Sequence, residues 1–439
     1  GWVGMLNIVD RVEVNTVPAY VLMRQVEALF NHVLRLPFQR RRWMSWIVCA
    51  SLVVLASKVM ADSVPGLLWT STYNGLGPCC LNSGRAIAVD LSGSIFVVGV
   101  NPPSPSVPGV VKYDSLGRLL WSRTFGSGNG VNGDWPYAIA TDSVGNAIVV
   151  GKAAVGSGKF YVLKFSPSGM ILWTRTPTIG LSDRAQGVAV DQANNIVVAG
   201  MSFGAYTTMA VAKFDSSGNL LWSRTIGQTN EEAYSVAVDP LGSIYLAGRF
   251  FDGIGDVYAL MKFDSGGNFM TANFNGPVGR ANSIVLDPIS GSLFVGGESG
   301  IAVYSPSLVL VGVLSGVSGN GIAVNSSGSI FVAGENTSPA AAKVTKIGRD
   351  GTSLWSTIYW DGNQSRANGV AIGPQGQVYV VGDEPTASPD YILTLAYVNP
   401  ARLESTLDLA PSTASVGQWV RVALTVTNTG GVNANGVSP

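Results

Sequence analysis

The chain has 439 residues, of which 46% are hydrophobic and only 12% charged, and its formal net charge at neutral pH is zero. These values exclude a disordered chain and a strongly basic nucleic-acid-binding protein, and they leave enough apolar residues for a large buried core. The 54 glycines recur at regular intervals along the sequence. This composition favours short strands joined by tight turns, so we expect an all-β protein.

The N-terminal segment, residues 1–61, has the pattern of a leader with an export signal. Three arginines at 40–42 precede a mostly apolar run at 43–56, and Val59 and Ala61 occupy the small-residue positions read by signal peptidase. The run is shorter than the roughly 20 residues that cross a bilayer, so we expect cleavage after Ala61 and no membrane span in the mature chain.

The expected mature chain keeps 20 basic and 24 acidic residues, which argues against a nucleic-acid partner. It also loses His32, the single histidine of the sequence. Its two cysteines, Cys79 and Cys80, are adjacent and have no other cysteine to pair with in an oxidising compartment. A strained disulfide between them and two free thiols both remain open.

A hairpin pattern, AVDxxGxIxVxG, recurs seven times and organises residues 62–400. Each copy contains four strand-like segments, which cannot bury both faces until neighbouring copies stack on them. The pattern therefore predicts the blades of a propeller. The acidic or equivalent positions are spaced by 52, 49, 48, 48, 38 and 48 residues, at Asp90, Asp142, Asp191, Asp239, Asp287, Asn325 and Gly373.

Alternation and turn residues place the first three strands of the fourth copy at 235–239, 243–248 and 257–264. The phase of the repeat predicts how the ring closes. An outer strand at 67–73 has no third strand before it, whereas the last copy ends with a third strand at 391–397. The two halves complete one blade, so we expect a closed ring of seven four-stranded antiparallel blades.

The outer strand of most copies carries a tryptophan, and an arginine follows two residues later in three of them. Side chains two residues apart in a strand share a face. A tryptophan repeated on outer strands typically packs one blade against the next, and cofactor docking is the alternative. These residues are Trp69, Trp121, Trp173, Trp222 and Trp355, with Arg123, Arg175 and Arg224.

The copies resemble the seven-bladed β-propeller repeats of secreted bacterial and archaeal proteins, whose units run like VAVDxxGNIYVAG and KFDSSGNLLWSRTFG. Residues 213–227 match the second unit almost letter for letter, and the resemblance covers residues 66–399. It implies export and a scaffold, without catalytic residues common to the family. The fifth copy departs from the pattern, because about eight residues are missing between Gly297 and Tyr304.

The segment 401–439 follows a different pattern. Its alternation of apolar and polar residues around Trp419 to Val426 resembles the opening strands of immunoglobulin-like repeats in bacterial and archaeal surface proteins. Fewer than forty residues cannot form such a β-sandwich, which takes about 100. We therefore expect the start of a truncated immunoglobulin-like domain.

Ligand-binding residues are expected on one face of the propeller. In a four-stranded meander, the long loops between second and third strands and between blades share a face, and variable loops on a rigid scaffold commonly bind ligands. Aromatic rings beside carboxylates suit a protein or polysaccharide partner, and solvated loops without a ligand are the alternative. The candidates are Asp134, Trp135, Tyr206, Phe251, Trp360 and Asp361.

The sequence favours a non-catalytic recognition or structural module of a secreted or cell-surface protein, with no metal and no cofactor. The turns at 215–219 and 264–268 resemble calcium loops but are too short to supply the ligands. Without histidine in the mature chain, no Ser-His or Cys-His pair can form.

Two enzyme alternatives stay open. A glycan-acting hydrolase or lyase would use carboxylates from neighbouring loops. A quinone-dependent dehydrogenase is suggested by a partial likeness of Gly218 to Trp222, and of the cysteine pair, to quinoprotein propellers. The carboxylates are Glu231, Glu232, Asp252 and Asp256.

Overall fold

The computed structural model divides the chain into two compact units, one of residues 64–400 and one that combines residues 1–63 with 401–439. The expected leader, Cys79 and Cys80 lie outside the residues that the structure describes. Among the described residues, no helix has the length and apolar character needed to cross a bilayer. The described residues are 65–73, 83–101, 107–126, 134–154, 158–227, 230–314, 317, 319–384, 391–398, 403–410 and 421–428.

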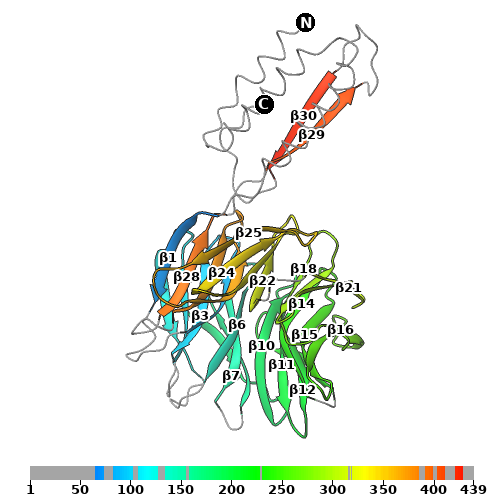
Figure 1. Cartoon of the computed structure of the whole chain (residues 1–439). Coiled ribbons are helices and arrows are strands. Elements are labelled where there is room, and N and C mark those ends of the chain that lie inside the picture. Colours follow the sequence, from blue (N-terminus) through cyan, green and yellow to red (C-terminus); the bar gives the residue numbers. More distant parts are fainter. Residues whose placement is uncertain are drawn as a thin grey trace, which may run out of the picture. The chain divides into compact units, whose positions relative to one another are not determined.

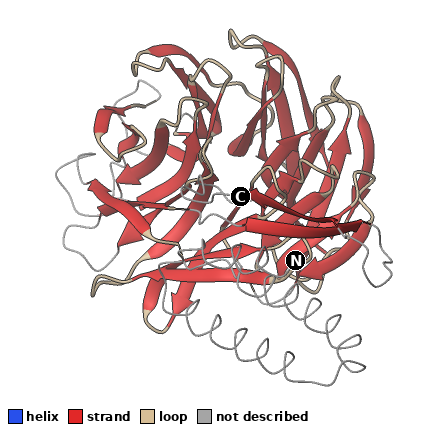
Figure 2. Cartoon of the chain, turned by 90° about the horizontal axis from the view of Figure 1, so that it is seen from above, coloured by secondary structure: helices blue, strands red, loops and turns tan. Residues whose placement is uncertain are grey.

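The larger unit consists of seven four-stranded antiparallel sheets arranged around a common centre (Figures 1 and 2). The predicted all-β propeller with seven blades is confirmed. We number the blades 1 to 7 in chain order, and in each the first strand is innermost. Blades 1 to 3 contain β2 (Ser83–Val89), β3 (Ile95–Asn101), β4 (Val107–Tyr113) and β5 (Leu119–Thr124); β6 (Trp135–Thr141), β7 (Ala147–Ala153), β8 (Lys159–Phe165) and β9 (Ile171–Arg175); and β10 (Ser182–Val190), β11 (Ile196–Phe203), β12 (Thr207–Phe214) and β13 (Leu220–Ile226).

Blades 4 to 6 repeat this order. Blade 5 is compressed where the fifth copy is short, because only Glu298 and Ser299 separate its second and third strands. The strands are β14 (Glu231–Val238), β15 (Ile244–Phe251), β16 (Asp256–Phe263) and β17 (Phe269–Asn273); β18 (Ala281–Leu286), β19 (Leu293–Gly297), β20 (Gly300–Tyr304) and β21 (Leu310–Leu314); and β22 (Gly321–Val324), β23 (Ile330–Thr337), β24 (Ala340–Ile347) and β25 (Ser353–Tyr359).

Blade 7 closes the ring as predicted. Its first three strands are β26 (Arg366–Ile372), β27 (Val378–Glu384) and β28 (Tyr391–Tyr397), and its outer strand is β1 (Leu67–Tyr73). Strands β1 and β28 pair antiparallel, with Tyr73 opposite Ile392. The two ends of the propeller sequence are thus joined by backbone hydrogen bonds within one sheet.

The innermost strands are longer than expected. In blade 4, β14 begins at Glu231 instead of residue 235, and β15 continues to Phe251 instead of residue 248. The register of β14 shifts between Ala233 and Ser235, which marks a bulge. A bulge breaks the two-residue alternation, so the sequence pattern stops at the bulge although the pairing continues beyond it. Glu231 and Glu232, expected in a loop, are therefore strand residues.

The hydrophobic core lies between the blades. Seven clusters of buried side chains occur in the described part of the propeller, and each combines two neighbouring blades. At the interface of blades 2 and 3, for example, Ile148 and Phe160 lie in one cluster with Ile196 and Phe214. Removing one blade would expose two such clusters, so the ring is stable only as a whole.

The outer-strand tryptophans link successive blades, as the sequence predicts. Trp173 of blade 2 donates from Nε1 to the carbonyl oxygen of Ser216 in blade 3, at 3.2 Å. Its indole lies against Gly218, where an added Cβ would come within 2.7 Å of the ring. Gly218 also has a φ of 83°, in the left-handed region that favours glycine. The turn glycine of the repeat therefore accommodates the preceding blade's tryptophan.

Buried lysines strengthen the same junctions. Lys164 of blade 2 pairs with Asp142 of its own blade at 2.9 Å and donates to the carbonyl oxygen of Ser216 at 3.0 Å. Burial acts to raise the pKa of Asp142, but hydrogen bonds from Asn146 and Lys164 together hold it below its usual value. Each such lysine connects the first turn of its blade to the outer turn of the next.

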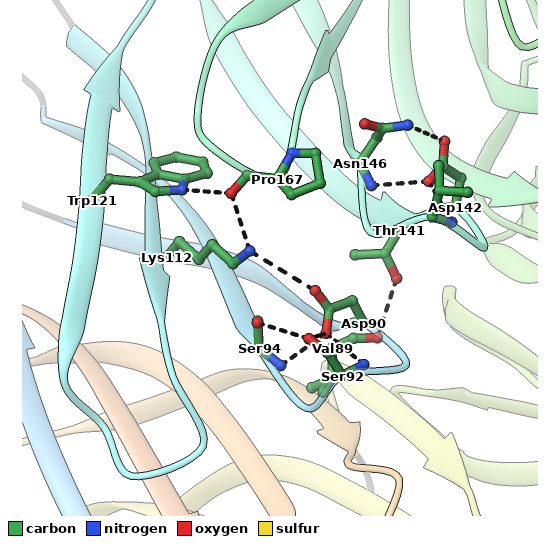
Figure 3. A network of polar contacts seen from close by, with 11 residues as sticks. Val89, Asp90, Ser92, Ser94, Lys112, Trp121, Thr141, Asp142, Asn146 and Pro167 are labelled. Atoms are coloured by element: carbon green, nitrogen blue, oxygen red, sulfur yellow. Dashed lines mark hydrogen bonds and ion pairs between the residues drawn. The ribbon is translucent and has the colours of Figure 1, made fainter.

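Figure 3 shows the equivalent junction of blades 1 and 2. Lys112 lies 3.9 Å from Asp90, and both Lys112 Nζ and Trp121 Nε1 donate to the carbonyl oxygen of Pro167. Burial lowers the pKa of Lys112, against the opposing effect of Asp90. The repeated Asp, Lys and Trp thus form a frame on the face that carries the short turns.

The smaller unit contains an antiparallel pair, β29 (Leu403–Ala410) and β30 (Arg421–Asn428), with Leu407 opposite Leu424. Its assignment to an immunoglobulin-like domain stays a prediction.

Candidate functional site

The two faces of the propeller differ in their connections. The first-to-second and third-to-fourth turns are short and are held by their own acidic side chains, as at Asp215, whose Oδ1 accepts from the amides of Ser217 and Asn219. This bonding accounts for the turns that resembled calcium loops. The other face, which we call the loop face, carries the remaining connections, and each innermost strand begins there.

The sequence-predicted ligand residues lie on the loop face but come from four blades. Asp134 is buried and accepts a 2.7 Å hydrogen bond from the amide of Ala154, so it holds a loop in place. Trp135 is the half-buried first residue of β6, an innermost strand. These two residues belong to blade 2.

The other four candidates lie on different blades. Tyr206 of blade 3 and Phe251 of blade 4 are 58% and 40% exposed, and Trp360, directly after β25 of blade 6, is 47% exposed. Asp361 accepts from the amide of Asn363 at 3.0 Å and therefore shapes its own turn. The six candidates are therefore spread over four blades.

Two of the four carboxylates considered for glycan hydrolysis, Glu232 and Asp256, are bound by arginines. Arg249 contacts Glu232 Oε1 and Asp256 Oδ1, each at 2.7 Å, and Arg280 Nε lies 2.9 Å from Asp256 Oδ2. Burial acts to raise the pKa of Asp256, but the two arginines hold it below its usual value. Asp252 accepts from the amides of Ile254 and Gly255.

A general acid in glycoside hydrolysis needs a raised pKa, so this network lacks the character of such an acid. The enclosed carboxyl of Glu384, at the end of β27, has the opposite property: burial, and then Asp361, raises its pKa. Glu384 is only 3% exposed, so a substrate has little access to it.

A set of side chains lies where the innermost strands begin, and the sequence analysis named only Trp135 and Glu232 of this set. In six blades the register of the innermost strand shifts across one residue, which marks the bulge. The bulge residue stands five positions before the acidic position of the repeat. The residue seven positions before the acidic position lies close to it, at or near the start of the same strand. We call the residues at these two positions of all copies the mouth. The first set is Arg85, Tyr137, Gln186, Tyr234, Asn282, Asn320 and Asn368; the described members of the second are Ser83, Trp135, Arg184, Glu232, Arg280 and Arg366.

The glycine that ends the repeated hairpin makes this bulge possible. A Cβ on Gly151 would overlap the carbonyl oxygen of Trp135, and one on Gly200 would overlap that of Arg184. Only glycine lets the second strand approach the bulged first strand this closely. This glycine is therefore a sequence signal for the bulge. From it, the mouth residues could have been predicted by counting five and seven positions back from the acidic residue of each copy.

Amides at the mouth connect blades. Gln186 donates to the carbonyl oxygen of Ala233 at 3.3 Å, Asn320 to that of Ala367 at 3.2 Å, and Asn368 to that of Gly84 at 2.8 Å. In each case the acceptor belongs to the innermost strand of the next blade. These residues have a structural role that follows from the repeat.

Arginines and aromatic rings alternate across blades 1 to 3. The guanidinium of Arg85 in blade 1 lies 5.6 Å from the ring centre of Trp135 in blade 2. On the other side of the same strand, the guanidinium of Arg184 in blade 3 lies 5.6 Å from the ring centre of Tyr137. These four half-buried residues form a continuous cationic and aromatic patch on three innermost strands.

A cavity of about 390 Å³ lies elsewhere, at the outer rim between blades 2 and 3. It is shallow, and Arg175 bonds the carbonyl oxygen of Gly218 beside it at 2.7 Å. None of the six predicted ligand residues lines it. Because it sits at a blade junction made by the repeat, we do not assign it a function; its lining residues are Arg175, Thr176, Pro177, Phe214, Gly218, Asn219 and Leu220.

Neither a protein-family model nor a curated protein matches the chain. Among solved structures, an inactive histidine-to-alanine variant of virginiamycin B lyase from Staphylococcus aureus, solved with quinupristin, is similar at 10% identity and a TM-score of 0.52, over 74% of this chain and 98% of that one. Sqt1 from Chaetomium thermophilum is similar at 12% identity and a TM-score of 0.50, over 76% and 98%. A protein of unknown function from Dyadobacter fermentans follows at 12% identity, 0.46, 76% and 99%. The likenesses to the lyase and to Sqt1 show the propeller fold.

Proposed function

We propose that the propeller is a non-catalytic recognition or scaffold module of a secreted or cell-surface protein, which binds a protein or glycan through its loop face. The observation that carries this proposal is the contrast between the two faces. One face repeats the same buried frame in successive blades, whereas the other presents exposed aromatic rings and charged side chains that differ between blades. A rigid scaffold with variable loops is the usual arrangement of a binding protein.

Export is part of the same proposal. The arginines at 40–42, the apolar run after them and the expected cleavage after Ala61 support a secreted or envelope location. The resemblance of the repeats to those of secreted bacterial and archaeal proteins points the same way.

An extracellular enzyme remains the second candidate. The raised pKa of Glu384, caused by burial and then by Asp361, is the observation in its favour, because a carboxyl with a perturbed pKa beside a second carboxyl suits acid-base chemistry. Its enclosure argues for a structural role instead. The quinone-dependent version relies on Cys79 and Cys80, and it stays a prediction. The similar lyase is inactive without a histidine, whereas no histidine occurs between residues 67 and 397 of this chain.

Thermal melting of the full chain against surface polysaccharides, protein fractions, calcium and pyrroloquinoline quinone tests these candidates. A ligand at one hundred times its dissociation constant adds about 2.7 kcal/mol to the free energy of unfolding, which raises the melting temperature. We expect a glycan or protein to stabilise the chain, and this effect to be lost when Trp135, Tyr206 and Trp360 are all replaced by alanine.

The matched control is Leu241→Ala, which removes an 89% exposed apolar side chain from the opposite face. Stabilisation by quinone with calcium, or turnover that disappears in Glu384→Gln, would instead establish the enzyme.

A further inference from the structure

In the cationic and aromatic patch of blades 1 to 3, two guanidinium groups have no hydrogen-bond acceptor among the described residues. Arg85 and Arg184 make no hydrogen bond and no ion pair of 4 Å or less within the described part of the chain. In each, Nε is enclosed without a hydrogen-bond partner, whereas the terminal nitrogens are not enclosed. Guanidinium groups held in this way have donors available for an incoming acceptor.

The outer rim offers an internal comparison for this stacking. Arg224 lies 5.8 Å from the ring centre of Trp222, almost the same geometry as at the mouth. Its terminal nitrogen, however, donates to the carbonyl oxygen of Ser223 at 2.8 Å. Arg123 and Arg175 likewise donate to the preceding carbonyl. Stacking on an aromatic ring alone therefore does not explain why Arg85 and Arg184 lack acceptors among the described residues.

A third cation adjoins the patch. Lys152 stands directly opposite Trp135 in the pairing of β6 with β7, so the two side chains share a face of the sheet. Lys152 also makes no hydrogen bond or ion pair among the described residues. A Cβ on Gly158 would lie 2.5 Å from Lys152 Cε and 3.4 Å from Ser182 Oγ, which places the lysine at the junction with blade 3.

The carboxylates around the patch are already bound to other groups. Asp134 accepts from the amide of Ala154, and Asp183, 1% exposed, accepts from the amides of Ile179 and Gly180. Asp383 accepts from Asn368 at 2.6 Å, and it lies beyond ion-pair distance of Arg85 while still interacting with its charge. Buried and hydrogen-bonded carboxylates leave the exposed end of the patch cationic.

We infer that this patch binds the carboxylate groups of an acidic saccharide, with Arg85, Arg184 and Lys152 contacting carboxylates and Trp135 and Tyr137 contacting sugar rings. A uronic acid carries its planar carboxylate directly on a ring with an apolar C–H face. This combination matches a guanidinium fork held beside an aromatic ring. In an acidic peptide the side-chain carboxylates are not attached to a ring. Such a peptide therefore matches the alternating arginines and aromatic rings of the patch less well.

Hydroxyl groups of the saccharide also find an acceptor. Gln186 donates from Nε2 to the carbonyl oxygen of Ala233, and its Oε1 remains as an acceptor two residues along the strand from Arg184. The inference rests on the proposed binding function of the loop face and assigns that face a ligand class. It predicts binding at the channel mouth of blades 1 to 3, in contrast to the outer loops that carry Tyr206 and Trp360.

Isothermal titration calorimetry of the full chain with oligogalacturonate, and with its methyl ester, tests the inference. We expect the acid to bind and the ester, which keeps the rings but loses the charge, to bind at least tenfold more weakly. The double variant Arg85→Gln and Arg184→Gln should lose at least tenfold in affinity, and Arg85→Lys should lose part of it because it keeps the charge without the fork.

The control is Arg224→Gln at the outer rim, which we expect to bind like the unaltered chain, and the melting temperature of every variant shows that it folds. Equal binding of acid and ester, or equal loss in the rim control, overturns the inference. Binding of polyglutamate in place of the saccharide also overturns it and assigns the patch to acidic peptides. Binding of neutral glycans or proteins alone overturns it while the proposed function stands, and no binding to any of these ligands contradicts both.

Discussion

Arginines lie at or beside the mouth on two sides of the propeller, and the partners of these arginines differ. On the side of blades 4 and 5, Arg249 and Arg280 share the carboxylates of Glu232 and Asp256 in a chain of ion pairs of 2.7 to 2.9 Å. On the side of blades 1 to 3, Arg85 and Arg184 lie against aromatic rings and contact no carboxylate within 4 Å among the described residues.

The comparison teaches that residue type and repeat position do not determine the role of a side chain. Arg184 and Arg280 occupy the same position, seven residues before the acidic residue of their copies. Arg184 lies against Tyr137, whereas Arg280 pairs with Asp256. The two preceding copies both have a tyrosine at the bulge, but the third strand begins with Lys159 in one and with Asp256 in the other. A neutralised arginine stabilises the ring, whereas an arginine without an acceptor is available to a ligand.

The largest expected effect comes from the frame that supports both sides. Lys164→Met removes the partner of Asp142, whose side chain is 2% exposed, and leaves a buried carboxylate without its cation. We expect a loss of about 3–5 kcal/mol in the free energy of unfolding, measured by urea titration. Lys262→Met is the control: in its blade Asp239 accepts from Tyr245 instead, so the loss should be clearly smaller. Similar losses in both variants would show that the buried pair is not what stabilises the junction.

A smaller effect separates the two sides directly. Arg249→Met leaves Glu232 and Asp256 without their shared donor, and we expect a loss of about 2 kcal/mol. Arg184→Met removes only a cation–aromatic contact, so we expect a loss of less than about 1 kcal/mol. The difference in melting temperature between these two variants measures how much more the ion-paired arginine stabilises the chain than the arginine that only contacts a ring. If Arg184→Met destabilised the chain as much, its guanidinium would be a structural element like Arg249.

The smallest expected effect concerns pH. Burial raises the pKa of Asp383, so its stabilising contribution is present below the unfolded value of about 3.9 and is lost as pH rises through the folded value. Asp383→Asn should therefore raise the free energy of unfolding at pH 7 by up to about 1 kcal/mol, with no gain below pH 4.

The other side of the mouth has the opposite sign. The pKa of Asp256 is lowered, so its contribution is present above about pH 4 and lost as pH falls through the folded value. Asp256→Asn should destabilise the chain at pH 7, and its effect should diminish in acid. Unfolding measured across pH 3 to 8 compares the two variants, and parallel curves would contradict the distinction.

The sequence was sufficient for the fold because the fold depends on repeated features. The spacing of Asp142, Asp191 and Asp239 gives the length of one blade. The glycine at 218 is the residue against which the tryptophan of the preceding blade packs. The single outer strand at 67–73 predicts that the ring closes by pairing with the last blade. Each of these features follows from local turn chemistry or from contact with the adjacent copy.

The candidate site was predicted only in part. Exposed aromatic residues on loops were named, and of these only Trp135 belongs to the mouth. Arg85 and Arg184 were missed because they lie in strands, where charged residues normally point to solvent, and because the bulge that redirects the chain is not visible in the alternation pattern. Their role also depends on aromatic residues of an adjacent copy, about 50 positions away in the sequence.

The pairing of β1 with β28 has a consequence for the order of events during synthesis. Strand β1 leaves the ribosome before any blade exists, and its partner is made after every innermost strand is complete. Until then β1 has no strand to pair with, and the most recently made blade has an uncovered face and strand edge that other chains can contact. The final hydrogen bonds join residues far apart in the sequence, so we expect closure of the ring to be a slow step of folding.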